Sequence, residues 1–196
     1  MSKKNQVDSA TLSHCLSSNN LIILGGTFDP IHNGHYSIIK SIKSVFPESK
    51  IIVVPTFQSP FKTKPLLVAR QRLLLLKKLV LSIPNLTIDP YELYKEKTSY
   101  SIDTIKYIKD KNPTHKLYFC IGEDASQTLP KWKDFKSILE LVTLLIVPRS
   151  SHTYSNSFTE QRYPTPSILL PMKTIDVSST EIKLSIQALT PKKLRN

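Results

Sequence analysis

Glycine is confined to two places in this sequence, and each place directly follows a short apolar run. Only four glycines occur in 196 residues, whereas a typical chain of this length holds about 14. Three lie in the segment GGTFDPIHNGH, residues 25–35, and the fourth is Gly122. Glycine this scarce indicates positions where the backbone adopts a positive φ or closely approaches another group. Because α/β proteins bind ligands at the ends of their strands, both places are candidate ligand sites.

Short apolar runs alternate with segments of helical periodicity along the chain. Strands are predicted at residues 21–24, 51–54, 86–88, 117–121, 144–147 and 167–170, and helices at 34–46, 69–81, 101–111 and 134–141. A polar loop is expected over 150–166, followed by a final helix over 178–189 that opens on a capping box. This alternation predicts an α/β fold, a single Rossmann-like domain whose parallel sheet has helices on both faces.

Composition limits the domain organisation and the location. The chain is 40% apolar and 21% charged, which fits one globular domain at residues 21–196 after a flexible extension over residues 1–20. No run is long and apolar enough to suggest a membrane span, and the N-terminus lacks the apolar stretch of a signal peptide. Cys15 in the extension and Cys120 in a strand suggest no disulfide, which favours the cytoplasm.

The net charge of +12 calls for an anionic partner. A surface this basic attracts nucleic acid nonspecifically, fits an enzyme of nucleotides equally well, and also arises from solvated lysines alone. Charge by itself leaves these alternatives open.

Two histidines, His32 and His35, lie at the predicted start of the helix that follows the glycines. A spacing of three places both imidazoles on one helix face, beside free N–H groups and the positive end of the helix dipole. Such a cluster suits phosphate oxygens and the charge that develops in a transition state. A histidine pair could also be structural or half of a zinc site. Zinc needs two more ligands that the other histidines do not supply, so no metal site is predicted.

The segment lacks the Gly-Lys-Ser/Thr of a P-loop and the Gly-x-Gly-x-x-Gly of a dinucleotide site. GGTFDPIHNGH resembles instead the nucleotidyltransferase signature with its T/HxGH core, and the full string resembles the nicotinate-nucleotide adenylyltransferases. Four further segments are similar to that family: PTFQSPFK (55–62), SYSIDT (99–104), IGED with LPKW (121–132) and VSSTEIK (177–183). The resemblance covers about residues 21–190. It implies adenylyl transfer from ATP to nicotinate mononucleotide, which gives deamido-NAD and pyrophosphate in NAD biosynthesis.

The resemblance also implies roles for individual residues. His32 and His35 are the catalytic pair and contact the ATP triphosphate. The other expected ATP-binding residues are Gly25, Gly26, Thr27, Phe28, Gly122, Asp124, Arg149, Ser178, Ser179, Thr180 and Lys183. The expected mononucleotide-binding residues are Thr56 and Lys62 near the phosphate, Ser101, and Trp132 stacked on the nicotinate ring. Mg²⁺ is expected as a cofactor held mainly by the ATP phosphates.

Several positions depart from the family pattern and leave the acceptor open. Ser59 replaces a proline, Phe61 a histidine, Thr98 a proline, Ser101 a threonine and Lys183 an arginine. Nicotinamide mononucleotide is the alternative acceptor, and a catalytically impaired nucleotide- or RNA-binding homologue is the alternative function. The retained histidines argue against nucleic acid as the partner, no membrane partner is expected, and the oligomeric state is left open.

Overall fold

Six parallel strands form one sheet in the order β3-β2-β1-β4-β5-β6. The computed structural model describes Cys15 and residues 17–81, 83–148 and 166–171. The strands are β1 (Asn20–Gly26), β2 (Lys50–Pro55), β3 (Leu86–Ile88), β4 (Lys116–Gly122), β5 (Thr143–Val147) and β6 (Ser167–Leu169). The strand order reverses between β1 and β4, which is where doubly wound sheets bind their ligands. The predicted Rossmann-like α/β fold is confirmed.

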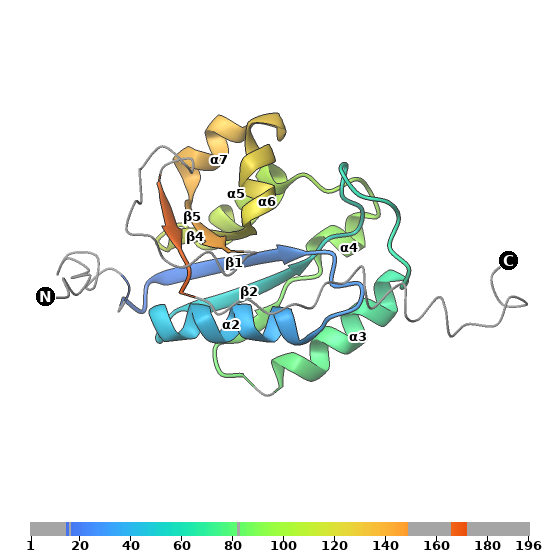
Figure 1. Cartoon of the computed structure of the whole chain (residues 1–196), viewed down its shortest axis with the longest axis horizontal. Coiled ribbons are helices and arrows are strands. Elements are labelled where there is room, and N and C mark those ends of the chain that lie inside the picture. The colour runs from blue at the N-terminus through green and yellow to red at the C-terminus, as the bar shows by residue number, and fades with distance from the viewer. Residues whose placement is uncertain (1–14, 16, 82, 149–165, 172–196) are drawn as a thin grey trace, which may run out of the picture.

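Helices cover both faces of this sheet (Figure 1). On one face lie α2 (Asn33–Val45) and α3 (Ala69–Val80), and on the other lie α5 (Ser101–Lys111), α6 (Glu123–Thr128) and α7 (Phe135–Leu141). A short helix, α4 (Tyr91–Lys95), follows β3. After each parallel strand the chain must return to the end of the sheet where that strand began, and crossover helices make this return.

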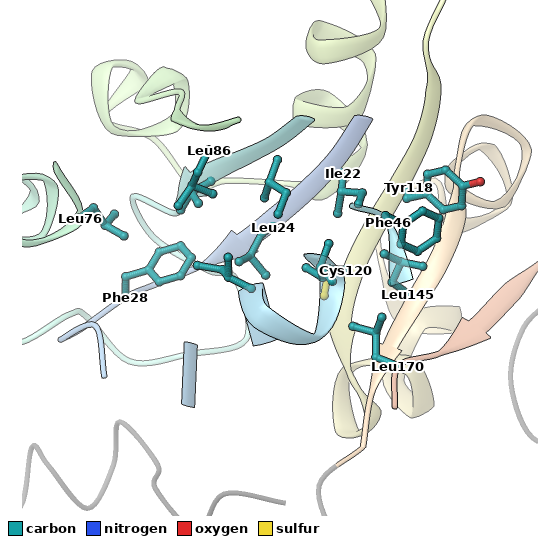
Figure 2. Close-up of a cluster of buried hydrophobic side chains, with 14 of the residues drawn as sticks. Ile22, Leu24, Phe28, Phe46, Leu76, Leu86, Tyr118, Cys120, Leu145 and Leu170 are labelled. Carbon is teal, nitrogen blue, oxygen red and sulfur yellow. The ribbon is translucent and has the colours of Figure 1, made fainter. Parts of the chain in front are cut away.

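The core consists of two apolar clusters, one on each side of the sheet. Alternate residues of β1 serve different clusters: Ile22 and Leu24 join the cluster on the α2 side, and Leu21 and Ile23 join the cluster on the α5 side. Figure 2 shows the first cluster, where Ile22 and Leu24 lie with Cys120 of β4. A strand that is covered on both faces reads as a continuous apolar run, which explains the pattern that predicted it.

Most expected helices and strands are confirmed, and their ends shift by one or two residues. Two helices, α4 and α6, and a 3₁₀ helix (Leu129–Lys131) were not predicted. Each is six residues or shorter, too short to display a helical repeat of apolar residues. The expected final helix and almost all of the expected loop over 150–166 lie outside the described residues.

Cys15 is only 7% exposed and packs in the cluster on the α2 side, and Asn20 opens β1. The domain boundary at residue 20 stays a prediction. Cys120 lies in β4, as expected, and both thiols are free and buried. Burial raises the pKa of Cys15 and raises that of Cys120 to about 12. In the part of the chain that the structure describes, no helix is long and apolar enough to cross a membrane.

Candidate active site

The loops after β1 and β2, which hold several of the expected site residues, meet at the carboxyl ends of these strands. The backbone N–H of Thr56, just after β2, donates to the carbonyl of Gly26 at the end of β1, with an N···O distance of 2.8 Å. This bond places Thr56 beside the end of β1. Thr56 opens the segment 56–62 that is expected to bind the acceptor (the acceptor loop), and Gly26 opens the segment 26–35 that is expected to bind ATP (the ATP loop).

His32 and His35 cap the start of α2 together. His32 is the N-cap residue, and its Nδ1 accepts a hydrogen bond from the N–H of Gly34 at 3.1 Å. Nδ1 of His35 accepts from the N–H of His32 at 3.3 Å. The ring centroids are 4.0 Å apart. Because Nδ1 of each neutral ring is an acceptor, the proton resides on Nε2, and the Nε2–H of each imidazole is a hydrogen-bond donor.

Both imidazoles are neutral near pH 7. Burial lowers the pKa of His32. Burial lowers the pKa of His35 to about 3, and the positive charges of His32 and Lys62 act in the same direction. The His35 ring also packs against Phe28, with centroids 4.9 Å apart. A neutral imidazole can donate a hydrogen bond without carrying a charge, and an anion bound beside the pair would raise both pKa values by its opposite charge.

In the loop after β1, the protein's own side chains leave little room for a residue larger than glycine. Phe28 is buried and has a left-handed backbone, with φ of 49°. A Cβ on Gly26 would approach Cζ of Phe28 to 3.1 Å, so this ring keeps residue 26 small. None of the four glycines has a positive φ, so of the two expected reasons for glycine only close approach remains. A Cβ on Gly122 would meet nothing within 4 Å, so that position faces open space at the end of β4.

Arg72 of α3 links the two loops of the candidate site, and the sequence alone did not single it out. Its side chain is 1% exposed, and Nη1 donates to the carbonyls of Thr27 at 2.7 Å and Thr56 at 2.6 Å. Nε donates to the carbonyl of Leu67 at 3.2 Å. Burial lowers the pKa of this guanidinium, and the Asp29 carboxylate opposes that shift. One buried cation thus fixes the spacing of the two loops that are expected to bind the two substrates.

Asp29 anchors the segment that leads into α3. It is 1% exposed, and its two carboxylate oxygens accept the N–H groups of Leu66 at 2.7 Å and Leu67 at 2.8 Å. These bonds give the carboxylate of the GGTFDP segment a structural role. Sequence pattern alone gave no sign of these bonds, because nearly forty residues separate Asp29 from its donors.

Gln58 joins the acceptor loop to the segment that precedes α5. Its carbonyl accepts the N–H of Ser99 at 2.8 Å, and its side-chain Nε2 donates to the carbonyl of Lys62 at 2.7 Å. Ser101 is the first residue of α5. The structure thereby brings the loop with Thr56 and Lys62 toward the start of α5, as the assigned roles require. Gln58 was also missed.

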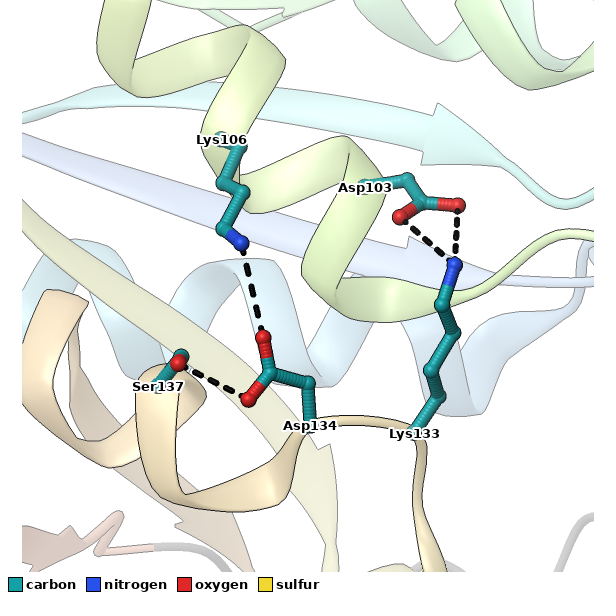
Figure 3. Close-up of polar contacts among 5 residues, drawn as sticks. All are labelled: Asp103, Lys106, Lys133, Asp134 and Ser137. Carbon is teal, nitrogen blue, oxygen red and sulfur yellow. Dashed lines mark hydrogen bonds and ion pairs between the residues drawn. The ribbon is translucent and has the colours of Figure 1, made fainter.

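Trp132 follows the 3₁₀ helix and lies half-buried beside the start of α5. Its Nε1 donates to Oγ1 of Thr128 at 3.4 Å. The next residue, Lys133, pairs with Asp103 of α5 at 3.1 Å, as Figure 3 shows. Its Nζ also lies 4.8 Å from the ring centroid of Tyr100. Exposed ion pairs of this kind add little stability, but they join the residue after Trp132 to the first turn of α5.

Some of the remaining expected site residues lie in the part of the chain that the structure describes, and the others lie outside it. Gly122 ends β4, and Asp124 lies exposed in the first turn of α6, at the same edge of the sheet. Gly25 is the last residue but one of β1, and a Cβ there would lie 3.4 Å from the ring of Phe119 in β4. Five expected ATP-binding residues lie outside the described residues: Arg149, Ser178, Ser179, Thr180 and Lys183.

Comparison with known proteins identifies the family of the chain. The cytidylyltransferase-like family model matches residues 23–185. A "probable nicotinate-nucleotide adenylyltransferase" from Aliarcobacter butzleri is 35% identical over 176 residues, which cover 89% of this chain and 92% of the relative. The chain belongs to the nicotinate-nucleotide adenylyltransferase family. A second adenylyltransferase of that name, from Aquifex aeolicus, is 33% identical and is covered over 99% of its length, against 82% of this chain.

The fold of this adenylyltransferase family member also matches a solved structure. Plasmodium falciparum nicotinic acid mononucleotide adenylyltransferase, complexed with NaAD, superposes with a TM-score of 0.69. The match covers 84% of this chain and 82% of that one, at 19% sequence identity. At this identity the likeness concerns the fold.

Proposed function

We propose that this chain transfers the adenylyl group of ATP to nicotinate mononucleotide, giving deamido-NAD and pyrophosphate in NAD biosynthesis. The observation that carries the proposal is the pair His32 and His35 at the start of α2, whose Nδ1 atoms are both occupied by backbone donors. Their Nε2–H groups form a pair of donors at the start of α2, just after the carboxyl end of β1. The names of the relatives support the same reaction.

The reaction is an in-line displacement at phosphorus. A phosphate oxygen of the mononucleotide forms a bond to the α-phosphorus of ATP, and the bond from that phosphorus to the bridging oxygen of pyrophosphate breaks. Negative charge moves onto the leaving pyrophosphate. Donors that are already oriented stabilise this charge without reorganisation, so His32 and His35 accelerate the step without forming a covalent bond.

The two substrates are assigned to opposite sides of the Arg72 contact. ATP lies along the loop from Gly26 to His35 and extends toward Gly122, and the mononucleotide lies along the loop from Thr56 to Lys62 and extends toward Ser101 and Trp132. The hydrogen bonds of Arg72 to Thr27 and Thr56 support this assignment, because they hold the loops at a fixed separation. A fixed separation is what a reaction between two bound substrates requires.

We propose that Mg²⁺ accompanies ATP and is held mainly by its phosphates. The carboxylate nearest in sequence to the histidine pair, Asp29, already accepts two backbone N–H groups. Phosphate oxygens are the preferred ligands of a small, hard cation that keeps several of its waters. Its charge would neutralise the triphosphate as pyrophosphate leaves. We also propose a cytoplasmic location, where ATP is supplied and where free thiols such as Cys15 and Cys120 are typical.

Pyrophosphate release tests the proposal. Purified protein is given fixed ATP and Mg²⁺ with either nicotinate mononucleotide or nicotinamide mononucleotide, and kcat/KM is compared. We expect turnover with both Mg²⁺ and an acceptor present, and a higher kcat/KM for the acid. Higher efficiency with the amide would reassign the acceptor. ATP binding without pyrophosphate release from either acceptor would instead indicate a binding homologue without catalysis.

A further inference from the structure

We propose that Phe61 and Trp132 form the two walls of a slot that takes the planar ring of the acceptor mononucleotide. Trp132 enters this slot from the family resemblance, whereas Phe61 is assigned by the structure. The inference rests on the proposed function, since it concerns the acceptor of that reaction.

The two rings are nearly parallel and lie close together. Their centroids are 6.5 Å apart and their planes differ by 25°. A planar ring between two others needs about 7 Å, twice the carbon contact distance of about 3.5 Å. The centroid separation of 6.5 Å lies close to this value. Direct contact between aromatic rings extends to about 7 Å, so the two rings touch only loosely before the ligand enters.

One wall is held in place and the other is exposed. Trp132 is fixed by its hydrogen bond to Thr128 and by the ring of Phe119, which meets it edge-on at 74° with centroids 6.4 Å apart. Phe61 is 60% exposed, although it is a large apolar side chain. An exposed aromatic ring that faces a fixed aromatic ring is well placed to cover a flat ligand, which would bury the apolar surface of both.

Neighbouring residues of the acceptor loop serve the two ends of a mononucleotide. The positive charge of Lys62 contributes to lowering the pKa of His35, so Lys62 lies toward the histidine pair and the reacting phosphate. The adjacent Phe61 faces Trp132 instead. A mononucleotide carries its phosphate at one end and its ring at the other, and this loop offers a cation and an aromatic face in the same order.

Kinetics of Phe61 variants test the slot. We expect Phe61→Ala to raise KM for nicotinate mononucleotide about tenfold, as the loss of one stacking face predicts, with KM for ATP unchanged. Phe61→Tyr keeps the ring and should keep the wild-type KM, whereas Phe61→Leu should behave like Phe61→Ala. The ratio of kcat/KM for acid and amide acceptors should not change, because both rings are planar. Tyr94→Ala, at a 75% exposed ring on α4, is the matched control.

Binding can be followed separately from turnover, because Trp132 is the only tryptophan in the chain. Nicotinate mononucleotide, added without ATP, should quench its fluorescence, and Phe61→Ala should raise the Kd of that titration about tenfold. An unchanged KM and Kd in Phe61→Ala, or wild-type values in Phe61→Leu, would overturn the slot. Absence of pyrophosphate from the wild type would overturn the proposed function, while the titration would still decide the slot. Thermal melts establish that each variant is folded.

Discussion

The backbone N–H of His32 donates a hydrogen bond to Nδ1 of His35, 3.3 Å away, at the first turn of α2. The same two side chains that are assigned to the ATP phosphates thus also cap a helix. Capping orients both rings before any ligand arrives, and it means that removal of a ring changes stability as well as chemistry. The two effects can be separated by the choice of substitution.

His32→Asn and His32→Ala form the informative pair. Asparagine is a good N-cap residue, so His32→Asn should keep the melting temperature, whereas His32→Ala should lose about 1 kcal/mol and lower Tm by about 2–4 °C. Both should reduce kcat about 10²–10³-fold, because both remove the Nε2–H donor. Pyrophosphate release and a thermal melt check this. Wild-type kcat in His32→Asn would show that the imidazole serves the cap alone.

The buried ring of His35 makes stability depend on pH. Its pKa is about 3 in the folded protein and about 6.5 in an unfolded chain. Between these values the unfolded state binds the extra proton, so the stability that is fully present above about pH 6.5 is lost as the pH falls toward 3. Urea unfolding across this window should show a shallower pH slope for His35→Asn than for the wild type. Parallel slopes would contradict the folded-state pKa.

Arg72 should matter for both substrates although it lies in the core. Arg72→Met leaves the carbonyls of Thr27 and Thr56 without their donor and should lower the free energy of unfolding by about 3–5 kcal/mol. Arg72→Lys keeps the charge but not the fork that reaches both carbonyls. In Arg72→Lys we therefore expect KM to rise for ATP and for the mononucleotide together. Arg70→Met, at an exposed position of the same helix, is the control. An effect on one KM alone would argue against a shared anchor.

Two glycine-to-alanine changes should behave in opposite ways. Gly26→Ala places a methyl group 3.1 Å from Phe28 and should destabilise the fold by about 1–3 kcal/mol through overpacking. Gly122→Ala meets nothing within 4 Å and has an ordinary extended backbone, with φ of −70°. It should leave stability unchanged and raise KM for ATP, if adenosine approaches that backbone as proposed. Urea unfolding and ATP kinetics measure the two effects, and an unchanged KM would remove Gly122 from the adenosine site.

The sheet could be predicted from the sequence because a strand that is covered on both faces, such as β1, is a continuous apolar run. His32 and His35 could be predicted because their signal is local: a strand, glycines and a helix start in one short segment. Sequence reasoning missed Arg72 and Gln58, each of which bonds a residue far away in the chain, Thr27 and Ser99 respectively. One feature of the sequence does indicate that Arg72 is buried: it lies one turn before Leu76, which is buried in the same helix. No feature of the sequence indicates the role of Gln58, because a polar residue that bridges two loops cannot be distinguished from an ordinary polar loop residue by sequence pattern.

The burial of Cys15 and Cys120 has a practical consequence. A thiol reacts with maleimides and similar reagents as its thiolate, and both burial and a raised pKa suppress that form. The two natural thiols should therefore react slowly with such reagents and contribute little background to site-specific labelling. A single cysteine introduced at Tyr94, outside the proposed active site, would carry a fluorescent dye without removal of the natural thiols. The distance from that dye to the indole of Trp132 could then be followed as substrates bind.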